Sequence, residues 1–217
     1  MFPLPLHIYF EIAALVSSIV FWRSLSHSRL RWFLPFLCFI VLAELTGRYL
    51  SRELRQPNAW LYNFVVPLEY LFYSLMFYLH YKRKMSLFLV KLFFIIFPAY
   101  VLLSLIVKGV YYFDTNFLLV GSFVMIVFSL SYLLELYSLT LEVPIWKMPM
   151  FWICIGVLLF NAGEFSYNLL SKFFISNKMD QSLKVFRSIN NRLILILYSS
   201  FIIAFICQKI TDKYKKD

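Results

Sequence analysis

Long apolar runs, separated by short segments rich in Lys and Arg, follow one another along this chain. A helix needs about 20 apolar residues to cross the hydrocarbon core of a bilayer once. Runs of about this length lie at residues 4–22, 32–50, 59–81, 87–107, 117–136, 149–174 and 186–207. Because a lipid-exposed segment satisfies its own backbone hydrogen bonds only as a helix, the pattern predicts an all-α fold. We expect residues 1–217 to form one domain, a polytopic transmembrane bundle of seven helices.

The composition favours a bilayer over water or nucleic acid as the surroundings of this bundle. Hydrophobic residues make up 62% of the sequence, whereas soluble domains contain about 45–50%. The formal net charge is +10, but the Lys and Arg residues stand at the ends of the apolar runs and form no continuous basic stripe. Flanking residues of this kind anchor and orient membrane spans. We therefore expect the lipid bilayer as a partner, and no nucleic acid.

The flanking charges differ between the two sides of the predicted bundle. Eleven Lys and Arg residues lie on the side of the first, third and fifth loops and the C-terminal tail, against eight on the opposite side. Cytoplasmic loops are enriched in Lys and Arg. The difference therefore predicts an N-terminus outside the cell and a C-terminus in the cytoplasm.

A short internal similarity links the second and sixth runs. Residues 44–51 and residues 164–171 both follow the pattern Glu-x-x-x-polar-x-Leu-Ser. If the similarity is genuine, the bundle consists of two parallel repeats of three helices joined by the fourth helix, a 3+1+3 arrangement known from membrane proteins. Chance similarity between apolar helices is the alternative, and the sequence leaves both open.

Ionisable and amide side chains interrupt several of the apolar runs. Each ionisable side chain near the bilayer centre costs roughly 2.5–3.5 kcal/mol on insertion scales, so such residues usually face the bundle interior or water. Helical spacing gathers them into one stripe per span, as with Asn161, Glu164 and Asn168 in the sixth run. With the N-terminus outside, nearly all of these side chains fall in the outer half of the bilayer.

From this clustering we infer a polar cavity between the helices in the outer half of the bundle. Its predicted ligand-binding residues are Glu11, Glu44, Arg48, Glu69, Tyr73, Asn161, Glu164, Asn168, Asn191 and Arg192.

Other interpretations remain open for several of these residues. Glu44 and Arg48 have the spacing of an ion pair within one helix, and Asn191 could cap the start of the last helix. Interhelical hydrogen bonds from Asn and Glu could serve packing alone. Glu135, near the cytoplasmic end of the fifth span, is expected to be an ordinary exposed carboxylate.

The sequence contains no recognisable catalytic or metal-binding motif. Its three histidines are scattered without metal-ligand spacing, and the three cysteines lie singly inside apolar runs. Nucleotide-binding loops and serine-nucleophile motifs are also absent from the sequence. We therefore expect no catalytic residue, no metal and no cofactor, although an unrecognised membrane enzyme remains an alternative.

At the level of topology, the chain resembles small, uncharacterised seven-helix bacterial membrane proteins that are often regarded as sensor-like. The resemblance is carried by the aromatic-rich spans, the Ala43-Glu44 and Tyr62-Asn63…Glu69 stretches and the Asn-rich last span. It covers the whole chain but involves no specific motif, so it transfers no site residue. It implies a multi-pass protein of the cell membrane, in bacteria the inner membrane.

Three functions are compatible with these observations. The first is a receptor-like or sensor module that binds a small polar ligand in the outer-half cavity and signals to a separate cytoplasmic or membrane partner. The second is a small proton-coupled transporter in which Glu164 or Glu69 takes up a proton. The third is a structural or assembly subunit of a membrane complex.

Overall fold

The computed structural model describes residues 5–138, 144–176 and 184–214. In these residues the chain forms eight α-helices and two short 3-10 helices, and no strand. In chain order the elements are α1 (Leu6–Val20), α2 (Trp22–Leu25), η1 (Arg29–Trp32), α3 (Phe33–Arg52), α4 (Ala59–His80), α5 (Lys84–Lys108), α6 (Thr115–Ser138), η2 (Ile145–Lys147), α7 (Pro149–Ser176) and α8 (Lys184–Tyr214). The expected all-helical fold is thereby confirmed.

Five segments are long and apolar enough to cross a membrane. They are Arg29–Arg52, Lys84–Lys108, Thr115–Ser138, Pro149–Ser171 and Arg187–Asp212. The helix α1 is apolar but has only 15 residues. The helix α4 has 22 residues, but its tyrosines, Asn63 and Glu69 lower its mean hydropathy. The structure therefore supports a multi-pass membrane protein, while the number of spans stays a prediction.

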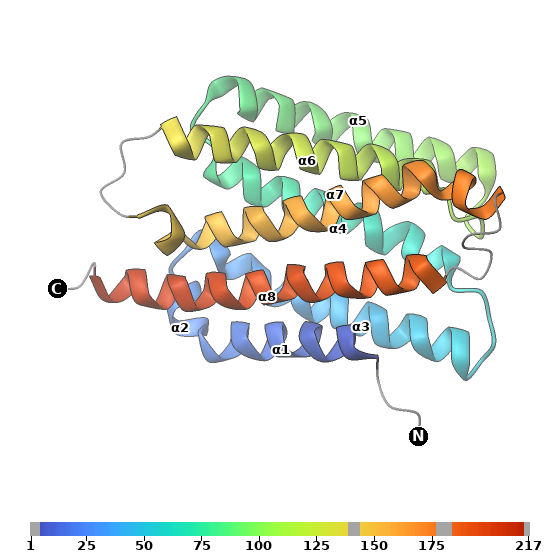
Figure 1. Cartoon of the computed structure of the whole chain (residues 1–217), viewed down its shortest axis with the longest axis horizontal. Coiled ribbons are helices and arrows are strands. Elements are labelled where there is room, and N and C mark those ends of the chain that lie inside the picture. The colour runs from blue at the N-terminus through green and yellow to red at the C-terminus, as the bar shows by residue number, and fades with distance from the viewer. Residues whose placement is uncertain (1–4, 139–143, 177–183, 215–217) are drawn as a thin grey trace.

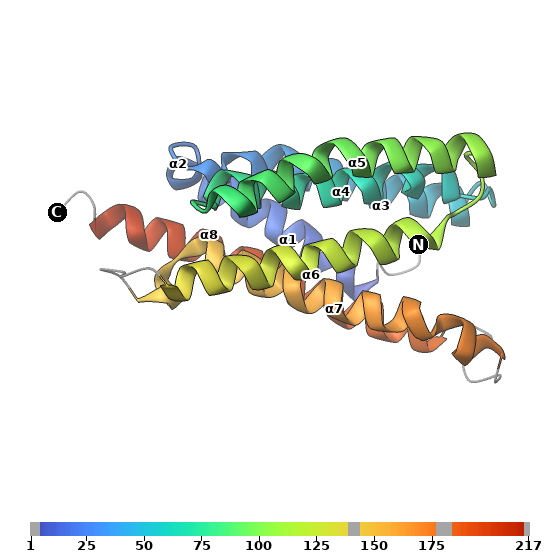
Figure 2. The same cartoon turned by 90° about the horizontal axis from the view of Figure 1, so that it is seen from above.

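The long helices run roughly along one axis, and each runs opposite to its neighbour in the chain (Figure 1). The start of α1 and the end of α8 therefore lie at opposite ends of the bundle (Figures 1 and 2). In the contacts between helices, α1 packs against α3 and α8, α4 against α3 and α6, and α7 against α6 and α8. These six helices form a closed ring. The helix α5 lies outside it, against α4 and α6.

The outer surface of α5 is apolar, whereas the ring is held together by aromatic side chains. Ile95, Leu102 and Ile106 of α5 are 71%, 61% and 81% exposed. Inside the ring, Phe33 is fully buried and makes edge contacts with aromatic rings of α4 and α8. A large exposed apolar face, such as the outer surface of α5, indicates contact with a partner or with lipid. A bilayer accounts for this face on a helix of 25 residues.

Glycine and aspartate fix the turn between α5 and α6. Gly109 follows α5 with φ +84°, and its N–H donates to the carbonyl of Leu105 at 3.0 Å. Asp114 is buried and accepts hydrogen bonds from Ser104 and Lys108 at 2.6 Å each. Burial alone would raise the pKa of Asp114, but these bonds and a third from the Asn116 N–H outweigh it and lower the pKa below the ordinary value.

Candidate ligand-binding cavity

A cavity of about 140 Å³ lies inside the ring of helices. Its walls are formed by Glu11, Ile40, Glu44, Tyr62, Val65, Val66, Glu69, Tyr70, Tyr73, Phe160, Glu164, Asn190, Ile194, Leu197 and Tyr198. Glu11 and Asn190 lie in the first halves of α1 and α8, and Glu44 and Glu164 lie in the second halves of α3 and α7. Because these helices alternate in direction, all four positions fall toward the end of the bundle where α1 begins (Figure 1). We call this the four-glutamate cavity.

Glutamates from four different helices converge on the cavity. Glu11 comes from α1 and is 2% exposed, whereas Glu44 of α3, Glu69 of α4 and Glu164 of α7 are half-buried. Glu11 interacts electrostatically with Glu44 and Glu69, and Glu69 with Glu44 and Glu164. Like charges repel and burial disfavours the ionised form of a carboxyl group. Such a cluster therefore attracts positive charge more strongly than separate carboxylates in water.

Two tyrosines of α4 hold two of these carboxyl groups in place. The Tyr62 hydroxyl donates to Oε2 of Glu44 at 3.1 Å. The Tyr70 hydroxyl lies 3.3 Å from Oε2 of Glu164, and Ser122 of α6 donates to the same oxygen at 3.2 Å. The carboxyl group of Glu44 therefore links α3 to α4, and the carboxyl group of Glu164 links α7 to both α4 and α6.

Each of these two tyrosines lies against a glycine of a neighbouring helix. A Cβ added at Gly47 of α3 would lie 2.7 Å from the Tyr62 hydroxyl oxygen. A Cβ added at Gly121 of α6 would lie 2.4 Å from the ring of Tyr70. Both glycines leave the space that a tyrosine ring occupies. The two positions therefore contribute to the cavity without lining it.

Two polar atoms of the cavity wall are buried without a hydrogen-bond partner among the described residues. They are Oε2 of Glu11 and the hydroxyl of Tyr73, and each residue is 2% exposed. A buried donor or acceptor left unpaired costs about 1–3 kcal/mol. Both atoms belong to residues that line the cavity. They can therefore accept from and donate to a molecule bound there.

Five of the ten predicted site residues line the cavity, namely Glu11, Glu44, Glu69, Tyr73 and Glu164. The other five lie outside its walls. Arg48 is half-buried, and its charge lies near His7. Asn161 is fully buried and donates to the Val157 carbonyl of its own helix at 2.7 Å. Asn168 is half-buried, whereas Asn191 and Arg192 are exposed.

Sequence reasoning missed three tyrosines and Asn190. Tyr62 shares the stripe of Glu69 and could have been included on that signal. Tyr70 directly follows Glu69 and lies about 100° around the helix from it, so a single-stripe rule excludes it. The helix α4 contacts both α3 and α6 and therefore presents two adjacent faces to the interior. Asn190 carries the same signal as the adjacent Asn191, an amide at the start of the last apolar run, but the sequence does not say which of the two faces inward. Tyr198 gave no signal without knowledge of how α8 is rotated.

The expectation for Glu135 of α6 was wrong. Its side chain is only 3% exposed, and its Oε1 accepts a hydrogen bond from the backbone N–H of Lys82 at 2.6 Å. Lys82 lies in the short connection between α4 and α5. Glu135 therefore fixes a turn between helices at the end of the bundle opposite the cavity, a structural role that its spacing in the sequence does not reveal.

Comparisons with protein-family models, curated proteins and solved structures gave no match for this chain.

Proposed function

We propose that this chain is a multi-pass membrane receptor or sensor-like module that binds a small polar ligand in the four-glutamate cavity. The ligand enters from the outer side, and the opposite end of the bundle reports binding to a separate cytoplasmic or membrane partner. The observation that carries the proposal is the convergence of four carboxyl groups on one cavity, together with two polar atoms that have no hydrogen-bond partner within the described part of the chain. Ionisable groups are expensive inside a bundle of this kind, and their concentration at one place favours a functional site.

The proposal includes seven membrane spans, with α1 and α4 joining the five most apolar segments. The polar residues that lower the mean hydropathy of α4 face inward, because Asn63 and Tyr73 are buried and Glu69 lines the cavity. The helix α1 lies in the ring between α3 and α8. A helix that completes such a ring has the same surroundings as its neighbours, and we therefore assign it to the bilayer.

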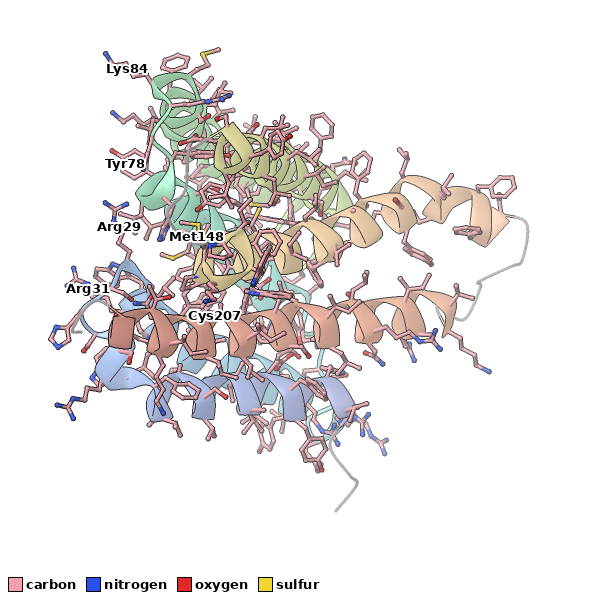
Figure 3. The ribbon with its side chains drawn as sticks, turned by 60° about the vertical axis from the view of Figure 1, so that its left-hand side comes forward. Arg29, Arg31, Tyr78, Lys84, Met148 and Cys207 are labelled. Carbon is pink, nitrogen blue, oxygen red and sulfur yellow. The ribbon has the colours of Figure 1, made fainter. Side chains whose placement is uncertain are left out.

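The orientation proposed places the N-terminus outside, in a bacterial inner membrane. One end of the bundle carries eight exposed basic residues: Arg23, Arg29, Arg31, Lys82, Arg83, Lys84, Lys147 and Lys209. We call it the basic end. Arg29, Arg31 and Lys84 extend outward there (Figure 3). The positive-inside rule assigns this end to the cytoplasm, and the four-glutamate cavity then lies in the outer half of the bilayer.

The basic end also offers a place where a partner could bind. A recess of about 310 Å³ lies there, with walls that include Arg29, His80, Lys147 and Met148. These residues come from three separate parts of the chain, namely η1, the end of α4, and η2 with the residue that follows it. A ligand that shifts the helices of the ring would change the shape of this recess. We propose that the partner detects that change.

The packing of the ring supports the proposed 3+1+3 repeat. If α1, α3 and α4 correspond to α6, α7 and α8, then the contact of α1 with α8 corresponds to that of α6 with α4, and both contacts are present. The connecting helix α5 lies outside the ring. Glu44 and Glu164, at equivalent places of the two repeats, line the same cavity.

A proton-coupled transporter is the second candidate, and Pro67 is the observation that favours it. Pro67 lies inside α4, two residues before Glu69. Proline removes a helical hydrogen bond, so α4 can bend next to a carboxyl group that faces the cavity. A transporter would use that bend to expose Glu69 alternately to the two sides. A structural subunit remains the third alternative, and it requires neither ligand nor transport.

The test is thermal unfolding of the purified protein in detergent, with a panel of small metabolites and over a range of pH. Wild type is compared with Glu164→Gln and Arg48→Ala. We expect a compound that raises the Tm of wild type and raises the Tm of Glu164→Gln less, because Glu164 lines the cavity. Arg48→Ala probes a residue outside the cavity wall. Accumulation of the same compound in proteoliposomes would favour transport over sensing, and a panel without any effect would contradict both.

A further inference from the structure

The charged side chains in the walls of the four-glutamate cavity are all acidic. Among the described residues that line it, four are Glu and none is Lys, Arg or His. Arg48 lies one helical turn beyond Glu44 on α3 and could neutralise one carboxylate at most. At least three carboxyl groups therefore depend on protons or on a bound positive charge. A ligand with a negative charge would add to the repulsion among them.

The same walls are rich in aromatic rings. Tyr62, Tyr70, Tyr73, Tyr198 and Phe160 all line the cavity. The face of an aromatic ring attracts a cation, and cages of such rings are a known means of binding quaternary ammonium groups. Carboxylates combined with aromatic rings therefore match an organic ammonium group better than they match a neutral sugar or an alcohol.

The spacing of the carboxyl groups is unsuited to a metal ion. Among the described residues, no group of three or more His, Cys, Asp or Glu side chains is placed to hold a metal. Two of the four carboxyl groups instead accept hydrogen bonds from different hydroxyls, Glu44 from Tyr62 and Glu164 from Tyr70. A cation that contacts several of the four glutamates must therefore be larger than a single metal ion.

The volume of the cavity limits the size of that cation. A cavity of about 150 Å³ accommodates a molecule the size of benzene, and the four-glutamate cavity measures about 140 Å³. The ligand should therefore have on the order of six to eight non-hydrogen atoms, by comparison with benzene. Oε2 of Glu11 and the Tyr73 hydroxyl, both buried and unpaired among the described residues, can contact it.

We propose that the four-glutamate cavity binds a small organic ammonium cation. This inference rests on the proposed function, because it names the ligand class of the same cavity. The ammonium group lies among the carboxylates of Glu11, Glu44, Glu69 and Glu164, and the tyrosine rings surround its apolar substituents. The carboxylates offset its charge, and the cation in turn reduces their mutual repulsion.

The test compares three probes of one shape and three charges: choline, 3,3-dimethylbutan-1-ol and 3,3-dimethylbutanoate. 1,4-Diaminobutane serves as a cation of a second shape. Binding to the purified full chain is measured by calorimetry in lipid nanodiscs, for wild type, Glu11→Gln, Glu69→Gln and Glu135→Gln. Glu135 is buried like Glu11 but lies at the opposite end of the bundle, so Glu135→Gln is the matched control.

We expect at least one of the two cations to bind wild type and the Glu135→Gln variant alike. We expect its affinity to fall at least tenfold in Glu11→Gln and Glu69→Gln, and the neutral and anionic analogues to bind at least tenfold more weakly than this cation. If the neutral alcohol or the anion binds as tightly as the tighter-binding cation, the ligand is not selected by charge, and the inference fails while the cavity remains a binding site. If neither cation binds but neutral or anionic metabolites do, the inference also fails while the cavity remains a binding site. If no compound of any charge binds, the proposed function fails as well.

Discussion

Gly121→Ala is expected to disturb the cavity through Tyr70 although Gly121 does not line it. The added Cβ would lie 2.4, 2.5 and 2.7 Å from three ring atoms of Tyr70. That ring is 3% exposed and packs edge-on against Phe97 with centroids 5.7 Å apart, so it cannot move freely. Overpacking of this kind costs about 1–3 kcal/mol. Displacing the hydroxyl from Glu164 costs about 1 kcal/mol more, and the higher helix propensity of Ala returns up to about 1 kcal/mol.

The expected net effect of Gly121→Ala is a loss of about 2 kcal/mol in the free energy of unfolding, from the sum of these three contributions. The assay is reversible unfolding by SDS in mixed micelles, together with the affinity for whichever compound binds the cavity. Gly109→Ala is the control. It strains a residue with φ +84° and ψ 153°, but no atom of the described residues lies within 4 Å of the added Cβ. It should therefore cost about 1–3 kcal/mol and leave ligand affinity unchanged.

A double-mutant cycle separates the clash from any general effect of alanine. In a Tyr70→Ala background the added methyl group has no ring to meet, so only the higher helix propensity of Ala remains. Gly121→Ala should then be neutral or stabilise the protein by up to about 1 kcal/mol. An equal cost in both backgrounds would refute the reasoning. A Gly121→Ala protein with wild-type stability and ligand affinity would refute it as well.

Three further predictions concern other parts of the molecule. Asp114→Ala should lower the free energy of unfolding by about 1–2 kcal/mol through loss of the cap on the first turn of α6. Because the folded pKa of Asp114 is lowered, its contribution is complete above the ordinary Asp pKa of about 4 and is lost as the pH falls through the folded value. The acid dependence of the SDS unfolding free energy should therefore be weaker in the variant, and identical curves would contradict the assignment. Ile95→Lys, at a position that is 71% exposed on α5, should reduce membrane insertion by roughly 2.5–3.5 kcal/mol on a glycosylation-based insertion assay, whereas an unchanged yield would mean that α5 does not face lipid. In a cysteine-free background, Ser51→Cys should react with an impermeant maleimide added to intact cells and Lys84→Cys only after lysis, and the reverse pattern would invert the proposed orientation.

The membrane character and the converging glutamates were predictable because exposing apolar side chains to water, or ionisable side chains to lipid, costs free energy. Apolar runs of about 20 residues have one stable solution in a bilayer. A glutamate within an apolar run is expected to face the interior, and Glu11, Glu44, Glu69 and Glu164 line one cavity. That reasoning requires only the position of each residue along its own helix.

The tyrosines of the cavity could not be predicted in the same way. Tyrosine is tolerated at the lipid interface, in a packed core or around a ligand, and this chain has 15 of them. Which ones line the cavity depends on how each helix is rotated and on where neighbouring helices leave space. Gly47 and Gly121 provide that space for Tyr62 and Tyr70, although neither glycine marks a site in the sequence.

Burial of a carboxyl group does not by itself identify a functional residue, as Glu135 demonstrates. Glu135 is 3% exposed and Glu11 is 2% exposed. Glu135 accepts a backbone hydrogen bond from the connection between α4 and α5, whereas Glu11 lines a cavity together with three further glutamates. A protein that needed only packing could replace Glu11, Glu44, Glu69 and Glu164 with apolar residues and remove their mutual repulsion. An apolar residue in place of Glu135 would leave the Lys82 N–H unpaired, whereas Gln keeps an acceptor oxygen there. The four glutamates are therefore a cost to the fold that a ligand can offset, and their convergence is the reason to look for that ligand among cations.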